Sequence, residues 1–372
     1  MASVLGICNL HDSPKLGNLT EHRALGSVTF LGRYGLMDFT LSNFSNSGID
    51  SVAILADRNI HSVRSHIGSG QIWINNTKTG FQRFFFNEAR FSSEKFNTDV
   101  ANILANKDQF EDITADYVIV APAFFIMSFD FRELIKNHIA NNADVTILYH
   151  HSKNAADKYL NCDSLNIGAN GRVTAFSKVN SSTKNANVSL ETYVFNRETF
   201  RKIVSMTPQI SEVYQIRDMV RYCAEKSFIS LHSFAFNGLV LPILNIQDYF
   251  KHSTYLFDFT NRQKLFKDEW PIYTTTHNTP PSLYGEKAKV TNSFVANGSV
   301  IKGKVINSII SRNVVVEEGA VVENSILFTN TVVGKKTHIS YVVADKGAKI
   351  CEKKELLGEK DSLIFVPKGA KI

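Results

Sequence analysis

A repeat of six residues begins near residue 284 and constrains the C-terminal part of the chain more than any other feature does. Six residues form one flat side of a triangular parallel β-coil, so aliphatic residues at this interval are expected to stack inside the coil. The interval is carried by Ile309, Val315, Val321, Leu327, Val333 and Ile339, with Val314, Ala320, Ile326 and Val332 one position earlier. Glycines lie between these positions, where corners need tight turns: Gly298, Gly303, Gly319, Gly334 and Gly347. The pattern predicts a left-handed parallel β-helix whose six-residue track forms one interior ladder, whereas a β-sandwich would alternate with period two.

The sequence before this repeat has a different style. Short β-rich runs at residues 51–55, 117–120 and 144–149 alternate with longer segments of helical period. This alternation is typical of an α/β layer with buried strands and covering helices. Residues 250–283 begin in a helical pattern and end in Trp270-Pro271 and Pro280-Pro281, where proline cannot continue a helix. We therefore expect an α/β domain over residues 1–249, a linker over 250–283 and the β-helix over 284–372.

Composition narrows the classes of protein. The chain has a net charge of +6, and its basic residues are spread along the sequence, so we expect no nucleic acid partner. We find neither a secretory leader nor a run of about 18 apolar residues, so we expect a cytoplasmic protein without a membrane partner. The cysteines lie too far apart for a zinc or dithiol motif and are expected to be free and mostly buried: Cys8, Cys162, Cys223 and Cys351.

Three motifs carry a resemblance to a known family. Residues 32–43 (GRYGLMDFTLSN) with 46–49 (NSGI) match G-K-Y-R-I-I-D-F-x-L-S-N-x-x-N-S-G-I, and residues 270–274 (WPIYT) with Pro280-Pro281 match its W-P-I-Y-T…P-P linker. Residues 192–196 (TYVFN) lie where the family has a G-I-Y-x-F strand. The chain thus resembles the ADP-glucose pyrophosphorylase (glucose-1-phosphate adenylyltransferase) family. The resemblance implies a Rossmann-like, GT-A-like nucleotidyltransferase domain followed by a hexapeptide β-helix.

The nucleotide-binding elements of that family are altered in this chain. Where the family has a glycine-rich phosphate loop, G-G-x-G-x-R-L, residues 6–16 read GICNLHDSPKL, with one glycine, a proline and no arginine. Residues with a Cβ do not readily adopt the positive φ that such a loop uses. The family's R-A-K-P-A appears as residues 23–27 (RALGS), so Arg23 remains as a remnant of the nucleotide site and Leu25 replaces the lysine.

The acidic and sugar-phosphate positions are altered as well. Phe124 stands where the resemblance places the first metal-binding aspartate, or Ala123 if the register slides by one, and Pro242 stands at the second acid. Val179 stands at the sugar-phosphate lysine unless Lys178 has shifted register. Mg²⁺ needs oxygen ligands, which phenylalanine and proline side chains lack. We therefore expect no catalytic residue, metal site or cofactor in this chain, and Mg²⁺ only in a catalytic partner.

The retained scaffold and altered site resemble the non-catalytic GlgD-type members of the family. The resemblance implies a regulatory subunit that joins a catalytic ADP-glucose pyrophosphorylase subunit in a heterotetramer, or forms a homo-oligomer when alone. The partner would make ADP-glucose and pyrophosphate from ATP and glucose 1-phosphate for glycogen synthesis. Arg33 occupies a basic position that in the family helps to bind a phosphorylated sugar effector between the domains. The alternative for Arg33 is a surface arginine held by a salt bridge.

Two other functions stay open at this point. One is an active sugar-phosphate nucleotidyltransferase with a rebuilt site that uses Asp12, Lys15 and Asp38. The other is a hexapeptide-repeat acyltransferase, for which His338 is the candidate base because such enzymes typically use a histidine at a coil corner.

Overall fold

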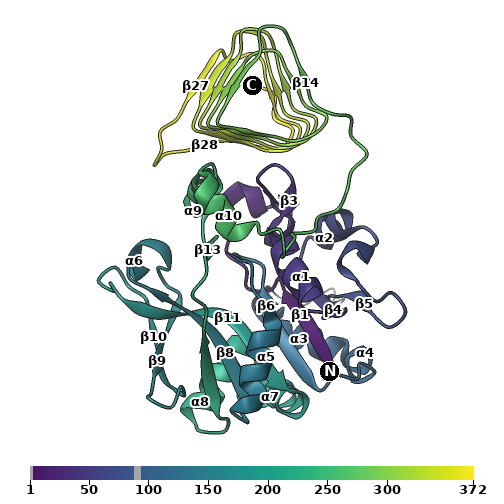
Figure 1. Cartoon of the computed structure of the whole chain (residues 1–372), viewed down its shortest axis with the longest axis vertical. Helices are drawn as coiled ribbons and strands as arrows, with labels where there is room; N and C mark the ends of the chain where they lie inside the picture. The colour runs from purple at the N-terminus through teal and green to yellow at the C-terminus, as the bar shows by residue number, and fades with distance from the viewer. Residues whose placement is uncertain (1–2, 88–93) are drawn as a thin grey trace.

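The computed structural model describes residues 3–87 and 94–372. An α/β domain and a three-sided β-helix lie at opposite ends of the molecule, with two helices and an extended segment between them (Figure 1). Within the described residues, no helix is long and apolar enough to cross a membrane.

A mixed sheet of nine described strands forms the centre of the α/β domain. The strand order is β10-β9-β11-β6-β1-β4-β5, and β8 pairs with both β11 and β12. The strands are β1 (Val4–Asn9), β4 (Ser51–Leu55), β5 (Phe81–Phe85), β6 (Tyr117–Pro122), β8 (Val145–Ser152), β9 (Asp163–Ile167), β10 (Val173–Lys178), β11 (Ala186–Asn196) and β12 (Leu231–Ala235). The three predicted strands correspond to β4, β6 and β8, so these predictions are confirmed.

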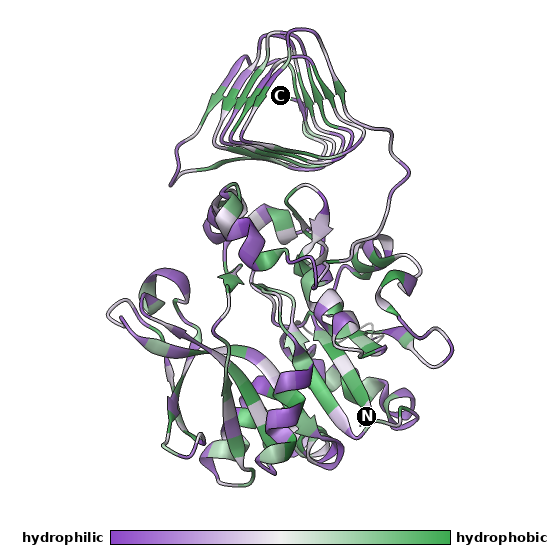
Figure 2. Cartoon of the chain, in the orientation of Figure 1, coloured by the Kyte–Doolittle hydropathy of each residue, from purple (hydrophilic) through white to green (hydrophobic). Residues whose placement is uncertain are grey.

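Hydrophobic cores cover both faces of this sheet because successive strand residues point to opposite sides. In β1, Cys8 belongs to the core under α1, while Leu5 and Ile7 belong to the core under α3, α7 and α8. Figure 2 shows the central strands as largely hydrophobic. The helices are α1 (Leu36–Asn46), α2 (Ile60–Ile67), α3 (Asp99–Ala105), α4 (Lys107–Glu111), α5 (Phe131–Ala140), α6 (Ala155–Lys158), α7 (Arg197–Ile210), α8 (Ile216–Glu225), α9 (Ile246–Tyr255) and α10 (Phe259–Leu265).

Two short strand pairs lie outside the main sheet. They are β2 (Thr29–Phe30) with β3 (Tyr34–Gly35), and β7 (Phe125–Ile126) with β13 (Leu241–Pro242). After α10 the chain runs extended to the β-helix, as the prolines predict.

Three parallel sheets of five strands each form the β-helix, so the predicted left-handed parallel β-helix is confirmed. The first sheet holds β14 (Leu283–Tyr284), β17 (Val300–Ile301), β20 (Val315–Val316), β23 (Val332–Val333) and β26 (Lys349–Ile350). The second holds β15 (Lys289–Thr291), β18 (Lys304–Ile306), β21 (Val321–Glu323), β24 (His338–Ser340) and β27 (Glu355–Leu357). The third holds β16 (Phe294–Val295), β19 (Ile309–Ile310), β22 (Ile326–Leu327), β25 (Val342–Ala344) and β28 (Ile364–Val366).

The prediction of a single interior ladder at six-residue spacing is wrong. Leu327, Val333 and Ile339 are inside the coil, but Val315 and Val321 are only half-buried. Ile309 belongs instead to the core shared with the α/β domain. Paired residues in successive coils are 15 or 17 positions apart, as in Val300 with Val315 and Val315 with Val332, and 22 apart between β25 and β28, rather than 18. A slip of one residue turns a strand side chain to the other face, so the six-residue track changes face along the coil.

The corners of the coil use asparagine as well as glycine. Of the predicted corner glycines, Gly298, Gly319 and Gly347 have positive φ. Gly303 does not, but a side chain there would collide with the backbone of Ala320 in the next coil. The asparagines with positive φ are Asn292, Asn307, Asn313, Asn324 and Asn330. Asparagine is the non-glycine residue that adopts this conformation most readily, so it supplies the same turns.

The third sheet of the β-helix faces the α/β domain. Ile309, Ile326 and Val343 share a core with residues of that domain. The rings of Tyr249 and Phe328 stack with their centroids 6.4 Å apart. One buried interface therefore fixes the β-helix against α9 and the β2–β3 hairpin, as Figure 1 shows. The cysteines are free, with Cys351 exposed and the other three buried.

Candidate functional site: an altered nucleotide site and a cationic cavity between the domains

The loop after β1, where the family has its phosphate loop, is tied to the protein itself. The His11 side chain is 3% exposed. Its Nδ1 lies 3.1 Å from the carbonyl oxygen of Asn97, and its Nε2 lies 2.9 Å from the side-chain nitrogen of Asn102. Burial lowers the pKa of His11, so the ring is neutral near pH 7. These contacts fix the loop against Asn97 and Asn102, just before and within α3.

A second buried contact fixes the end of β1. The Asn9 side chain donates to Asp99 at 2.7 Å, and Asp99 also accepts from the backbone N–H of Ile216 at 2.9 Å. Burial raises the pKa of Asp99 to about 7. Polar groups of three segments therefore satisfy one another at the mouth of the cleft.

The two positions assigned to metal-binding acids lie side by side. Pro242 pairs with Phe125 across β13 and β7, and the N–H of Ile243 donates to the carbonyl of Phe124 at 2.8 Å. The side chains at these positions are nevertheless phenylalanine and proline, both buried. They offer no oxygen ligand, so the residues present do not fit Mg²⁺. Among the described residues, no group of three or more histidine, cysteine, aspartate or glutamate side chains could hold a metal ion.

The other two altered positions are also buried and apolar. Leu25 lies in the short 3₁₀ helix Leu25–Ser27 and is part of the main core. Val179 is fully buried, and its backbone N–H donates to the carbonyl of Cys162 at 2.9 Å. The neighbouring Lys178 forms an ion pair with Asp163, with Nζ 2.9 Å from Oδ1. These substitutions are therefore part of the packed domain.

Arg23, predicted as a remnant of the nucleotide site, is bound elsewhere. Its Nη2 lies 2.6 and 2.7 Å from the two carboxylate oxygens of Asp345 in the β-helix, and both side chains are buried. Its guanidinium also lies over the ring of Phe328, 5.6 Å from the centroid. The two partners of the ion pair are 322 residues apart in the sequence, so the sequence motifs do not indicate this contact. Arg23 joins the two domains, and its role as a nucleotide-site remnant stays a prediction.

The residues of the rebuilt-site alternative have separate partners. Asp12 forms an ion pair with Arg217. Asp38 is fully buried, accepts the N–H of Gly35 at 2.8 Å and lies 2.6 Å from His66 Nε2. Lys15 lines a cavity that Arg23 also lines.

The acyltransferase candidate, His338, lies in β24 on the β-helix. Its side chain is 40% exposed, and its Nε2 is 3.4 Å from Glu323 Oε2. The described contacts of His338 indicate a surface ion pair rather than an enclosed base.

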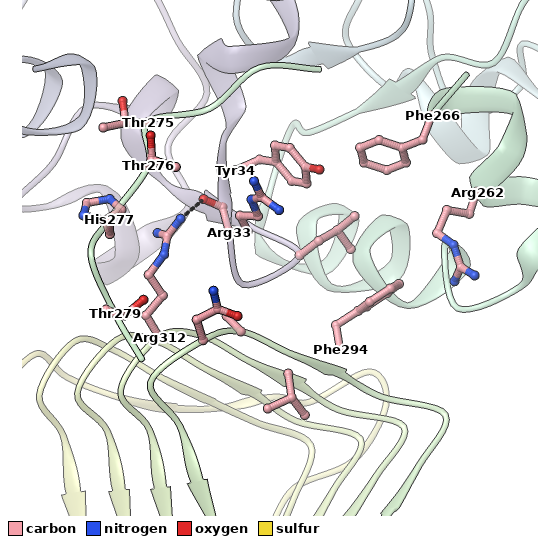
Figure 3. Close-up of a pocket in the computed structure, with 14 residues that line it drawn as sticks. Arg33, Tyr34, Arg262, Phe266, Thr275, Thr276, His277, Thr279, Phe294 and Arg312 are labelled. Atoms are coloured by element: carbon pink, nitrogen blue, oxygen red, sulfur yellow. Dashed lines mark hydrogen bonds between the residues drawn. The ribbon is translucent and has the colours of Figure 1, made fainter. Parts of the chain in front are cut away.

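A cavity of about 470 Å³ lies between the hairpin β2–β3, the extended segment and the β-helix (Figure 3). Arg33 lines it, as predicted for a residue between the domains. Leu31 and Gly32 both have positive φ and form the turn that carries Arg33. A side chain at Gly32 would come within 2.9 Å of the carbonyl oxygen of Ile310, so glycine permits the close approach of the hairpin to the β-helix.

The cavity is strongly cationic. Arg312 and Arg262 line it together with Arg33, and His277 adds a ring that can carry a proton. Arg312 Nη2 donates to the carbonyl of Arg33 at 3.4 Å, as the dashed line in Figure 3 shows. Burial and the neighbouring Arg33 lower the pKa of Arg312, and burial and Arg312 lower that of His277. Among the described lining residues there is no aspartate or glutamate.

Sequence reasoning identified only Arg33 of these residues. Arg312 lies two residues after the end of β19, and no motif marks it. The hexapeptide repeat places position 312 just after a strand of the sheet that faces the α/β domain. Which sheet faces that domain can be said only when the number of residues in each coil is known. The arrangement suits a small polyanion, because guanidinium groups form charge-assisted hydrogen bonds with phosphate oxygens.

Comparisons with known proteins agree with the fold and its two parts. Residues 13–236 match the family model "Nucleotidyl transferase", and residues 280–362 match "GlmU-like, C-terminal hexapeptide". The glycogen biosynthesis protein GlgD of Geobacillus stearothermophilus is 30% identical over 305 residues, which cover 82% of this chain and 78% of that protein. GlgD of Bacillus subtilis is 27% identical over 95% of this chain and 92% of its own. The glucose-1-phosphate adenylyltransferase of Acetivibrio thermocellus is 27% identical over 90% of this chain and 79% of its own.

The matched lengths and the shared architecture confirm the family resemblance drawn from the motifs. This chain belongs to the nucleotidyl transferase family of glycogen biosynthesis that includes the glucose-1-phosphate adenylyltransferases and GlgD.

Proposed function

We propose that this chain is a non-catalytic, regulatory subunit of ADP-glucose pyrophosphorylase. It would assemble with a catalytic homologue and modulate the formation of ADP-glucose and pyrophosphate from ATP and glucose 1-phosphate. The observation that carries the proposal is that Phe124 and Pro242, the buried residues at the positions of the family's two acids, lie on neighbouring segments held together by the Pro242–Phe125 strand pair and the Ile243–Phe124 hydrogen bond.

The chemistry of adenylyl transfer gives this observation its weight. Charge develops on the triphosphate during transfer, and an enzyme must stabilise it with donors, cations or metal ions. Two apolar residues at the metal position supply no ligand for a metal ion. The partner would therefore provide the Mg²⁺ site and the catalytic groups.

Features outside the cleft support assembly with a second subunit. The first coil of the β-helix exposes Leu283 and Tyr284 in β14 and Val290 in β15. In the described part of the chain β14 pairs with β17 alone, so its other edge has no strand beside it. Exposed apolar side chains at an open sheet edge are typical of a protein contact.

The test is to purify the chain alone and together with the catalytic homologue from the same cell. We expect the isolated chain to release no pyrophosphate from ATP and glucose 1-phosphate above background. We also expect it to form a complex that changes the kcat or KM of the catalytic subunit. Turnover by the isolated chain comparable to that of the partner would refute the proposal, and so would the absence of both a complex and a kinetic change.

The cationic cavity would bind the effector of this complex. A phosphorylated sugar places its phosphate oxygens against Arg33 and Arg312, while its ring contacts Tyr34 or Phe294. Effector titration of the assembled complex should show a response at least tenfold weaker in Arg33→Ala and in Arg312→Ala. Arg201→Ala, an exposed arginine on α7, is the matched control and should respond as the wild type does. An unchanged response in Arg33→Ala would mean that Arg33 is an ordinary surface residue and does not bind the effector.

A further inference from the structure

Glu191 has an unusual backbone for a glutamate. It lies inside β11, where the pairing with β8 shifts register between Ser189 and Thr192, and its φ is 48°. When Tyr193 and Phe195 are aligned with the Y and F of G-I-Y-x-F, Glu191 takes the position of the glycine. A side chain in the left-handed region costs about 1 kcal/mol relative to glycine, and such strain persists only where the surroundings enforce it.

The carboxylate of Glu191 points at an arginine that already has another acidic partner. Arg217, at the start of α8, places Nη1 3.2 Å from Glu191 Oε1 and forms an ion pair with Asp12 through Nη2. The side chain of Glu191 is 17% exposed. Asp12 also has positive φ, at 50°. Two acids on left-handed backbone residues therefore converge on one guanidinium.

This ion-pair group joins three segments of the α/β domain. Asp12 belongs to the altered loop after β1, Glu191 to β11 and Arg217 to α8. Lys178, next to Val179 at the expected sugar-phosphate position, lies in the same electrostatic neighbourhood, since its charge acts on Asp12. Lys178 itself is paired with Asp163. The group thus lies beside the altered loop and near Val179, the position at which the resemblance implies contact with the sugar phosphate.

The charges of the group are matched internally. Arg217 is held by Glu191 and Asp12, Lys178 by Asp163, and Arg221 by Glu225 at 2.9 Å. A phosphate ester that approached Arg217 would meet the two carboxylates already bound to it, and Asp218 Oδ1 lies 3.9 Å from its Nε. Like charges at such close range repel each other.

We propose that Glu191 is an internal anion that occupies Arg217 and thereby excludes a phosphate ester from this site. The inference deepens the proposed non-catalytic function and rests on it. The loss of metal ligands alone would not prevent glucose 1-phosphate from binding. The proposal assigns this exclusion to Glu191. Glycine at position 191 would relieve the backbone strain and free Nη1 of Arg217 to donate to a phosphate oxygen, while Asp12 would still hold Nη2.

The experiment compares binding of inorganic phosphate and of glucose 1-phosphate to the full chain by calorimetry and ³¹P NMR. We expect Glu191→Gly to gain a binding event at least tenfold tighter than any that the wild type shows at this site. Glu191→Gln, which keeps the side chain and removes its charge, should change affinity in the same direction. The gain should disappear in Glu191→Gly/Arg217→Gln, which separates it from binding in the cationic cavity between the domains. Glu225→Gln, which breaks the exposed pair with Arg221, is the matched control and should bind as the wild type does.

Several outcomes would overturn the inference. Folded Glu191→Gly that binds neither probe more tightly than the wild type would do so, and so would a gain that survives the Arg217 substitution. If Glu191→Gly does not fold, an unchanged affinity in Glu191→Gln would overturn the inference in its place. Turnover by the isolated wild type would refute the non-catalytic function instead, so the two failures are distinguishable.

Discussion

His252 links burial of a single residue to the pH dependence of stability. It lies in α9, is 5% exposed, and burial lowers its pKa to about 4, with Lys251 and Lys158 adding to the effect. In the unfolded chain the pKa is about 6.5. Between these values the unfolded state binds a proton that the folded state does not. The stability is therefore complete above about pH 6.5 and falls as the pH decreases toward 4, by up to about 3 kcal/mol.

Replacing His252 by leucine should reduce this acid sensitivity. We expect the free energy of unfolding of His252→Leu to change less between pH 7 and pH 4.5 than that of the wild type, by about 2 to 3 kcal/mol. His11 and His138, whose pKa values burial also lowers, should still contribute their share. Urea unfolding at several pH values measures the difference. Parallel pH profiles of variant and wild type would contradict the assignment to His252.

Within the β-helix, two neighbouring valines on one strand should differ in how much each contributes to the stability of the coil. Val316 is fully buried inside the coil, whereas Val315 in the same strand is half-buried on the outer side. Val316→Ala should destabilise the β-helix by about 2 kcal/mol, because it removes buried methyl groups and leaves a cavity. Val315→Ala, the matched control, should cost less than about 1 kcal/mol. Thermal unfolding followed by circular dichroism compares them, and equal losses would refute the assigned orientation.

The same strand shows how far the sequence can predict an element. The six-residue repeat was sufficient to predict a β-helix, because six residues per side is a property of the architecture. It could not predict which valine points inward, since coils with paired residues 15 or 17 apart break the strict count. The corner asparagines were missed for a related reason. Their positive φ becomes necessary only once the coil is closed.

At the scale of the whole molecule, the contacts between the two domains, within the described residues, are the features that the sequence motifs did not indicate. The motifs predicted the α/β class, the altered metal position and the place of Arg33. They could not predict Arg312 beside Arg33, or Asp345 beside Arg23, because both contacts depend on which face of the β-helix docks. Domain packing ties Arg23 to the β-helix and assembles a cationic cavity from separate segments.

The Arg23–Asp345 pair should therefore control how firmly the β-helix is held. Removing one member leaves a buried charge without its partner, and such changes cost about 3 to 5 kcal/mol. We expect Asp345→Ala to unfold at a clearly lower urea concentration than the wild type and to expose the extended segment, residues 271–282, to protease. Glu318→Ala, which breaks an exposed pair with Lys287 in the same β-helix, is the control and should cost less than about 1 kcal/mol.

A double substitution separates a net electrostatic gain from the penalty of an unpaired charge. Arg23 Nη1 is buried without a hydrogen-bond partner, so the pair itself carries a desolvation cost. Arg23→Met/Asp345→Leu removes both charges and keeps apolar contact with Phe328, so it should recover most of the stability lost in Asp345→Ala. Recovery together with restored protease resistance would mean that packing holds the domains and that the pair fixes their register. A double variant as unstable as Asp345→Ala would mean instead that the ion pair itself holds the β-helix in place.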